Sequence, residues 1–196
     1  MIFYEALMKV FEDEKHLDKL TFDNLLEKLK SATEIIREAL EDTHHIVEEK
    51  HIFPLFKGTK YEPLIKVLEE QHKIGRQITD ILLDFCSYEN FDIKICRHIR
   101  RYLSDYIYMY RAHQSREETI IFSLIRKITT SEQFLRLTLE FKSEMEKKYG
   151  KNWYRNTLEK IIILEQSLGI ASIGQYTPIL DPAAQKFLNN RHFANA

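Results

Sequence analysis

The sequence is poor in the residues that interrupt helices and in those that build covalent frameworks. Its 196 residues include five glycines, four prolines and two cysteines. So few glycines and prolines, beside many Glu, Lys, Leu and Ile residues, favour a nearly all-helical fold. Cys86 and Cys96 alone define neither a disulfide framework nor a cysteine-based metal site. We expect them to be small buried hydrophobic residues.

The chain also has no excess of charge and no long apolar run. It carries 29 basic and 30 acidic residues, for a net charge of −1, so we expect no nucleic-acid partner. No apolar run is long enough for a membrane span, and the first residues do not resemble a signal peptide. We therefore expect a cytoplasmic protein with no membrane partner. The hydrophobic content of 44% is enough for a substantial core.

One motif occurs twice. His44-x-x-x-Glu48 and His113-x-x-x-Glu117 each contain a Glu-Glu pair, and a phenylalanine follows in the same frame. On a helix, residues four apart lie on one face, so each motif presents an imidazole and a carboxylate together. A single pair of this kind is more typical of a solvated helix surface. The repetition in one frame favours a metal site in the interior.

The spacing of apolar residues predicts helices over about 3–30, 31–56, 63–82 and 91–127. Ser31-x-x-Glu34 is a capping box that would start the second helix. Gly58 would end that helix, and Pro54 would kink it or end it early. Pro63 suits the first turn of the third helix, and Asn90 is a candidate N-cap for the fourth.

Two further helices are expected beyond the fourth, over 131–149 and 153–168, ending at Gly150 and Gly169. The apolar run in the second of these is too broad for a lone surface helix. We therefore expect residues 129–196 to form a C-terminal extension that packs on the first domain or on a second subunit. The tail shows a helix start at Asp181-Pro182 but no ligand spacing.

The positions of four histidines predict how the first four helices are arranged. In an up-down bundle, residues at one level lie equally far from the turn between their helices. The midpoint of His16 and His44 is position 30, and that of His44 and His72 is position 58. The midpoint of His72 and His113 falls between positions 92 and 93. All three positions lie at predicted turns, so residues 1–128 are expected to form an up-down-up-down four-helix bundle with one histidine per helix at a common level.

The expected metal ligands are the histidines and glutamates that share this level: His16, His44, Glu48, His72, His113 and Glu117. Imidazole with carboxylate suits iron, manganese or zinc, and the absence of thiolate argues against a structural zinc. Six ligands are too many for one tetrahedral ion. Two octahedral ions bridged by the two carboxylates would use them all. Without a metal, burying these groups would be costly.

The residues leave several alternatives open. Glu49 and Glu118 take the place of Glu48 and Glu117 as ligands if the inward face of each helix is shifted by one residue. His45 is about 100° off the face and is expected outside the set of ligands. His51 is either a residue behind the ligands or a surface histidine at the helix end.

Three further residues have two interpretations each. Tyr106 and Tyr110 either hydrogen-bond a metal ligand or simply fill the bundle core. Gly75 either leaves room for a small molecule above the metals or is tolerated within the helix.

These motifs resemble the hemerythrin-like, or HHE cation-binding, family. The resemblance covers about residues 1–128 and lies in His16, His72, and the two His-x-x-x-Glu motifs with the Ile52-Phe53-Pro54 and Ile121-Phe122 that follow them. It implies a non-haem di-iron centre bridged by two carboxylates. Oxygen-carrying hemerythrins add a histidine one turn after the third-helix ligand, where this chain has Arg76. The set of four histidines and two glutamates looks more like the di-iron proteins associated with iron-centre repair and nitric oxide stress.

Three functions share this ligand set. The first is a di-iron protein, with manganese or zinc as alternatives, that binds or reduces dioxygen, nitric oxide or peroxide. The second is an iron-centre-repair or oxidant-scavenging enzyme. The third is a sensor in which the metal or redox state acts through the C-terminal helices, which would also be the surface of a homodimer. The sequence does not choose between binding and catalysis.

Overall fold

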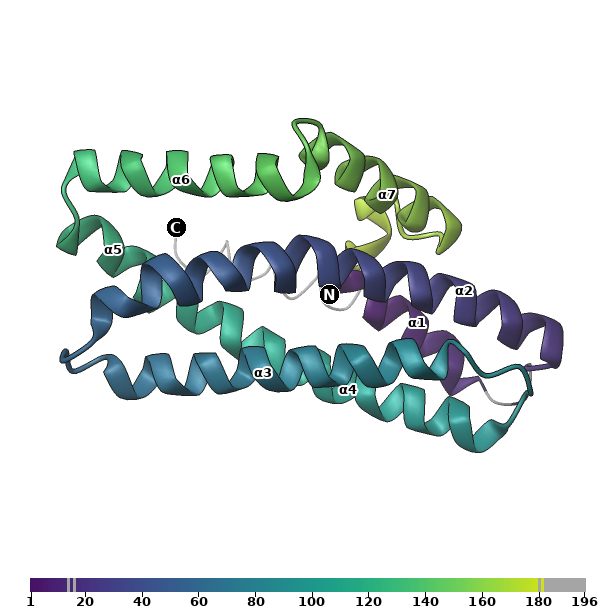
Figure 1. Ribbon diagram of the computed structural model, residues 1–196. Helices are drawn as coiled ribbons and strands as arrows, with labels where there is room; N and C mark the ends of the chain where they lie inside the picture. Colours follow the sequence, from purple (N-terminus) through teal and green to yellow (C-terminus); the bar gives the residue numbers. More distant parts are fainter. Residues whose placement is uncertain (14, 16, 180, 182–196) are drawn as a thin grey trace, which may run out of the picture.

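The computed structural model describes residues 1–13, 15, 17–179 and 181, and these residues form helices and no strand (Figure 1). This confirms the all-helical prediction. The α-helices are, in order, α1 (Ile2–Glu12), α2 (Lys19–Ile36), α3 (Glu62–Phe85), α4 (Ile93–Arg116), α5 (Phe122–Ile128), α6 (Ser131–Tyr149) and α7 (Trp153–Ser167).

Segments of π-helix join some of these helices into longer rods. The π-segments η2 (Arg37–His45) and η3 (Glu48–Ile52) extend α2, so that one helical rod runs over 19–52. The π-segment η5 (Glu117–Ile121) joins α4 to α5 in a second rod over 93–128. Both His-x-x-x-Glu motifs lie where these π-segments begin or end. Such wide turns are rare in helices and are frequent at functional sites.

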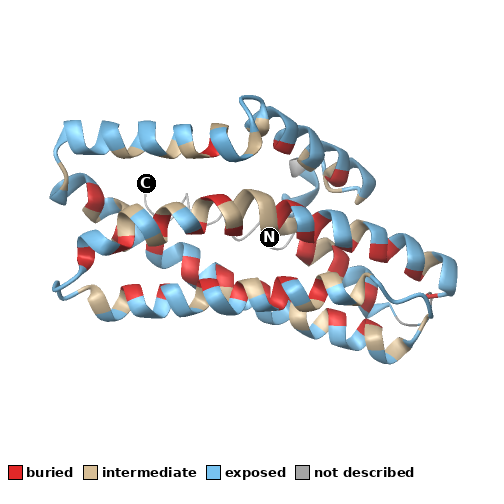
Figure 2. Ribbon diagram, viewed as in Figure 1, coloured by how far each residue is buried: buried red, intermediate tan, exposed pale blue. Residues whose placement is uncertain are grey.

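Helices α1 to α4 contact one another in a closed cycle, α1 with α2, α2 with α3, α3 with α4 and α4 with α1. Their facing sides carry the buried residues (Figure 2). One apolar cluster includes Phe22, Leu82 and Tyr106, and a second includes Phe56, Leu68 and Ile121. Along α3 and the rod 93–128, the polar side chains of the candidate site lie between these two clusters.

The predicted boundary between the first two helices is wrong. Helix α1 ends at Glu12, and α2 begins at Lys19, where the Asp18 carboxylate accepts a hydrogen bond of 2.7 Å from the Thr21 backbone N–H. Ser31 lies inside α2, and its hydroxyl donates to the Glu27 carbonyl at 3.0 Å. A serine caps a helix only where its own backbone leaves the helical conformation, and here the hydroxyl bonds back to the preceding turn instead.

This boundary affects the prediction that the four histidines lie at a common level, which assumed a turn midway between each pair. Positions 58 and 92 do fall in turns, on either side of α3, but position 30 lies inside α2. Helix α1 runs beside α4 as well as α2: the Tyr4 ring meets the Tyr106 ring edge-on, with centroids 5.3 Å apart, and the Arg111 guanidinium lies 2.7 Å from the Glu5 carboxylate. His16 lies outside the described residues.

The other helix ends follow the sequence signals closely. The rod 19–52 ends in a 3₁₀ turn, η4 (Phe53–Phe56), which contains Pro54, and Gly58 follows with a φ of +74°. Pro63 lies in the first turn of α3, as predicted. The N-cap of α4 is Asp92 rather than Asn90, because the Asp92 carboxylate accepts the Lys94 backbone N–H at 2.8 Å.

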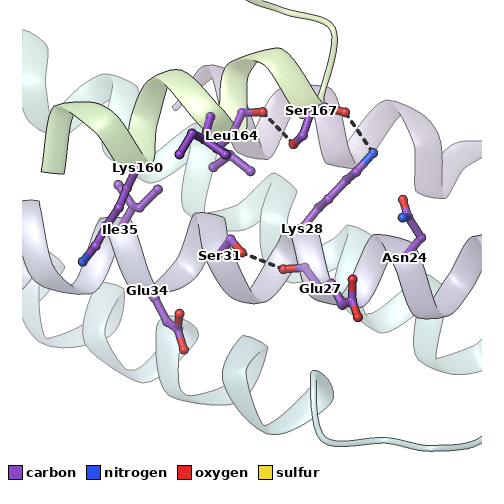
Figure 3. Close-up of a pocket in the computed structure, with 10 residues that line it drawn as sticks. Asn24, Glu27, Lys28, Ser31, Glu34, Ile35, Lys160, Leu164 and Ser167 are labelled. Atoms are coloured by element: carbon purple, nitrogen blue, oxygen red, sulfur yellow. Dashed lines mark hydrogen bonds between the residues drawn. The ribbon is translucent and has the colours of Figure 1, made fainter. Parts of the chain in front are cut away.

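The C-terminal helices end where predicted, with Gly150 and Gly169 at positive φ. Helix α7 packs on α2, where Lys28 Nζ donates to the Ser167 carbonyl at 2.9 Å beside a cavity of about 480 Å³ (Figure 3). Helix α6 is mostly exposed, and Met145 is its one buried residue (Figure 2). The helix start expected at Asp181-Pro182 lies outside the described residues from Pro182 onward.

None of the helices in the described part of the chain combines the length and the apolar character needed to cross a membrane.

Candidate metal centre

Four buried side chains from three helical rods converge between the two apolar clusters. His72 comes from α3, His113 from α4, Glu48 from η3 and Glu117 from η5. The Nε2 atoms of His72 and His113 lie 3.0 Å apart. Glu117 Oε1 lies 2.9 Å from His113 Nε2, and Glu48 Oε2 lies 3.6 Å from His72 Nε2. Two imidazoles and two carboxylates thus meet around one point.

In each of the two imidazoles, Nε2 points toward the centre of the cluster and Nδ1, the outer nitrogen, points away from it. The hydrogen bond made by Nδ1 determines whether Nε2 carries a proton or a lone pair. His72 Nδ1 lies 2.9 Å from a carboxylate oxygen of Glu49, and His113 Nδ1 lies 3.0 Å from the side-chain oxygen of Gln71. Both oxygens accept, so in the neutral imidazoles each Nδ1 carries the proton and each Nε2 presents a lone pair. Two lone pairs 3.0 Å apart repel each other unless a cation or a proton lies between them. Histidine ligands of metals are held in this way by hydrogen bonds from their outer nitrogen.

Several buried polar atoms in the cluster lack a hydrogen bond. Among the described residues, no donor makes a well-aligned hydrogen bond to either oxygen of Glu48, to Glu117 Oε1 or to His45 Nδ1. Leaving buried carboxylate oxygens without donors is costly. A metal cation would satisfy them and would separate the two Nε2 lone pairs. The donor set of imidazole and carboxylate therefore fits iron, manganese or zinc.

His45 is part of this buried cluster, so the expectation that it lies off the inward face is wrong. Its ring stacks on that of His72, with centroids 3.7 Å apart and planes 9° apart, and its Nε2 lies 3.2 Å from the Tyr110 hydroxyl. That expectation assumed the rotation of about 100° per residue of an α-helix. Residues 37–45 instead form a π-helix, which has more residues per turn. The wider turn directs His45 into the core.

His44 lies at the edge of the cluster, with 45% of its side chain exposed and Nε2 at 3.1 Å from Glu48 Oε1. The candidate ligand atoms form two groups of three, each within 4.8 Å of one another. One group is His45, His72 and His113, and the other is His44, Glu48 and Glu117. The expected ligands other than His16 are thus brought together, and His45 is added to them.

The charges of the cluster support one another. Burial raises the pKa of Glu117, but hydrogen bonds and charge from the His113 and His72 imidazoles, when these hold a proton in the metal-free protein, outweigh burial and lower this pKa. Burial lowers the pKa of His44, but the Glu48 contact and the Glu117 charge outweigh it and raise this pKa above its usual value. Burial, together with the nearby His72 and His44, lowers the pKa of His45 to about 2. Glu117 is therefore ionised and His45 neutral, which are the forms that bind metal.

The structure also places the alternative glutamates. Glu118 is exposed and accepts a hydrogen bond of 2.8 Å from Gln114, so it points away from the cluster. Glu49 stands behind His72: its Oε1 accepts from His72 Nδ1 and from Arg76, both at 2.9 Å. Arg76 therefore holds the carboxylate that orients His72.

Other residues singled out in the sequence have distinct environments. Tyr110 contacts His45, and His51 lies within 4 Å of Glu140 and Glu144 on α6. A methyl group added at Gly75 would meet Tyr106, Met109 and Glu41 at ordinary van der Waals distances of 3.6 to 3.8 Å. The space beside Gly75 is therefore already lined closely by side chains.

Sequence reasoning missed a buried polar cluster next to the site, centred on Glu41. This carboxylate is fully buried and accepts hydrogen bonds from Thr79 at 2.6 Å and from the Tyr106 hydroxyl at 3.4 Å. Its second oxygen lies 2.9 Å from Arg37 Nε. Burial raises the pKa of Glu41. The available signal was the spacing of Arg37, Glu41 and His45, each four residues from the next.

The chain belongs to the hemerythrin HHE cation-binding domain family, whose pattern it matches over residues 5–125. The chain is also similar to the uncharacterized protein Mb2018 of Mycobacterium bovis and the uncharacterized protein MT2051 of Mycobacterium tuberculosis. Each is 30% identical over 152 residues, which is 76% of this chain and 60% of the relative. The similarity therefore spans well under the full length of these relatives. No solved structure matches the chain.

The buried neutral His45 predicts a dependence of stability on pH in the metal-free protein. Its pKa of about 2 in the folded state lies below the value of about 6.5 in an unfolded chain. The unfolded state then binds more protons, so the free energy of unfolding falls as pH drops below about 6.5, by up to about 1.4 kcal/mol per pH unit. The raised pKa of His44 acts in the opposite sense, so we expect the His45 contribution to appear as a difference between wild type and a His45 variant in how the urea midpoint changes from about pH 7 to about pH 5.

Replacing the titrating group tests this assignment. His45→Phe should remove the His45 contribution to the change in the urea midpoint, because phenylalanine takes up no proton in the unfolded state. His98→Phe is the matched control, since His98 is an exposed histidine whose ring stacks on Phe85 far along α4 from the site. Equal pH slopes for wild type and His45→Phe would contradict the prediction.

Proposed function

We propose that this protein binds two iron ions between the rods 19–52 and 93–128 and helix α3, and takes up a small ligand there. The close approach of His72 Nε2 and His113 Nε2, 3.0 Å apart in a buried site beside two carboxylates, is the observation that carries this proposal. The ligands proposed are dioxygen, nitric oxide or peroxide. We further propose that helices α1 to α4, which contact in a cycle, form the up-down-up-down bundle expected of the sequence.

The positions of the two carboxylates support a bridged pair of ions. Glu48 extends one oxygen to 3.1 Å from His44 and the other to 3.6 Å from His72. Glu117 Oε1 lies 2.9 Å from His113 and 3.8 Å from His72, while Glu117 also groups with His44 and Glu48. Each carboxylate thus reaches ligands of more than one metal position. In this proposal His44, His45, His72 and His113 supply nitrogen, and His16 keeps the ligand role expected from the sequence.

The surrounding residues would orient the ligands and restrict water. Glu49, held by Arg76, and Gln71 fix the two imidazoles through their outer nitrogens. The Phe53 ring stacks on His72 at a centroid distance of 5.4 Å and covers one side of the site. Tyr110, whose hydroxyl lies 3.2 Å from His45, is the nearest hydroxyl donor. Reduced iron with an open coordination position would supply ligand binding and electrons.

The test is a titration of the reduced, iron-loaded protein with dioxygen, nitric oxide and hydrogen peroxide in turn under anaerobic conditions, followed by optical spectroscopy. We expect a saturable absorption change with at least one of them. The zinc-loaded protein is the control, because zinc has no redox chemistry and should show no change. An iron-loaded protein that responds to none of the three would contradict the proposed function.

A second candidate function is a sensor that acts through the C-terminal helices. The supporting observation is that α6 and α7 attach to the π-segments that carry or flank the candidate ligands. Glu144 pairs with Lys50, Lys148 lies 3.5 Å from the Asp42 carboxylate, and Lys160 pairs with Glu38. A change in oligomeric state between metal-free and oxidised protein would favour a sensor and a homodimer. Steady turnover of peroxide or nitric oxide would favour the scavenging or repair enzyme. The cytoplasmic location stays a prediction.

A further inference from the structure

A second cavity, of about 400 Å³, lies beneath α6, on the outer side of the site. Its volume is within the range of small-molecule sites in proteins. Its walls come from the end of the rod 19–52, from α5 and from the inner face of α6, and they are mainly apolar: Val47, Phe122, Ile125, Phe134, Leu137 and Phe141. The cavity is thus a half-open groove lined by three helical segments.

Polar contacts, together with the single buried residue Met145, hold α6 over this cavity. The contacts lie in its C-terminal half, where Glu144 pairs with Lys50, and Lys148 and Tyr149 contact the Asp42 carboxylate at 3.5 and 3.4 Å. In the N-terminal half, Phe134 lines the cavity and is still 43% exposed. The apolar side chains on the two walls therefore lack partners across the gap, which forfeits dispersion energy that a bound apolar molecule would supply.

The charged groups of the cavity indicate what such a molecule would carry. His51 and Arg126 are its two basic lining residues. His51 already faces Glu140 and Glu144. No carboxylate among the described residues pairs with Arg126. A planar guanidinium at the edge of an apolar cavity is well suited to a carboxylate, which it can bind through two parallel hydrogen bonds.

We propose that the cavity beneath α6 binds an apolar monocarboxylate, such as a medium-chain fatty acid, with its carboxylate on Arg126 and its chain between α5 and α6. This site is independent of the metal. It nevertheless adjoins the metal centre, because Phe122 lines the cavity and its ring lies edge-on to that of His44, with centroids 6.2 Å apart. A bound chain would therefore lie one side chain away from His44.

Calorimetric titration with decanoate, below its critical micelle concentration, tests the proposal on both metal-free and metal-loaded protein. We expect saturable binding in both. Along the series from hexanoate to decanoate, each added methylene should tighten binding about fourfold. The absence of saturable decanoate binding would overturn the proposal without affecting the metal site.

The carboxylate contact is tested by Arg126→Gln, titrated with decanoate and with 1-decanol. The variant should weaken decanoate binding about tenfold, because a hydrogen-bonded charge is lost, and should leave decanol binding unchanged. Arg136→Gln is the matched control: Arg136 is an exposed arginine of α6 that does not line this cavity. Equal effects of the two variants, or equal losses for decanoate and decanol, would overturn the assignment of Arg126.

The apolar part of the site is tested by filling it. Leu137→Trp should weaken decanoate and decanol alike, because the indole occupies the cavity. Leu139→Trp places the same residue on the exposed side of α6, away from this cavity, and should change neither affinity. Equal affinities of the two tryptophan variants would overturn the location, and circular dichroism verifies that both fold.

Discussion

Replacing both His72 and His113 with alanine should abolish iron binding. Removing a residue that only hydrogen-bonds a metal ligand already weakens metal binding by up to roughly 100-fold, and the loss of two ligands should exceed this. The two imidazoles provide the closest pair of candidate ligand nitrogens, 3.0 Å apart and completely buried. Without them, the carboxylates of Glu48 and Glu117 are left with the peripheral His44 and with His45. Iron content per chain after iron-replete expression measures the effect directly.

The matched control for this variant is His98→Ala, which removes an exposed histidine from the same helix as His113. It should leave iron content unchanged. Circular dichroism of the metal-free proteins separates loss of ligands from loss of fold. A folded double variant that keeps its full iron content would show that the metal lies elsewhere and would remove the basis of the proposed function.

Replacing Arg37 with methionine should lower the free energy of unfolding by about 3 kcal/mol, because it leaves the buried Glu41 carboxylate without its cation. Glu41 is fully buried, and Arg37 Nε lies 2.9 Å from its Oε2. Thr79 and Tyr106 still donate to the other oxygen, but neither carries a charge. Urea unfolding of the metal-free protein measures the change.

Two further variants separate the buried charge from the surface ion pair that Arg37 also makes. Asp80→Asn removes an exposed partner of the same guanidinium and should cost less than about 1 kcal/mol. The double variant Arg37→Met, Glu41→Leu removes the buried carboxylate together with its cation and should recover most of the stability. If Arg37→Met costs no more than Asp80→Asn, the cation is not needed to stabilise Glu41.

The sequence predicted those parts of the fold that depend on local chemistry. Glycines at positive φ end α6 and α7, and Pro63 lies in the first turn of α3. These signals act within one helical turn, so they can be read without knowing the neighbours. Ser31 shows the limit of such signals: its capping box is present in the sequence, but the hydroxyl bonds to Glu27 within a continuous helix.

The candidate site was predicted less completely, because its geometry depends on a change of helix type. The spacing of His44, Glu48, His113 and Glu117 indicated the right region. Whether His44 or His45 points inward depends on the π-helix over 37–45, for which no sequence signal is evident. Glu41 was missed because an Arg-Glu pair four residues apart is usually a surface feature. Its burial follows only from the packing of α2, α3 and α4.

The sparse burial of α6 has a consequence for how the molecule opens. Local unfolding costs least where few apolar contacts are broken, and Met145 is the one buried residue of this helix. Amide hydrogens of α6 should therefore exchange through openings that leave α2, α3 and α4 folded. Such openings uncover the cavity beneath α6 and the side of Phe122 that faces His44, so molecules enter this region through a transient fluctuation and need no permanent channel.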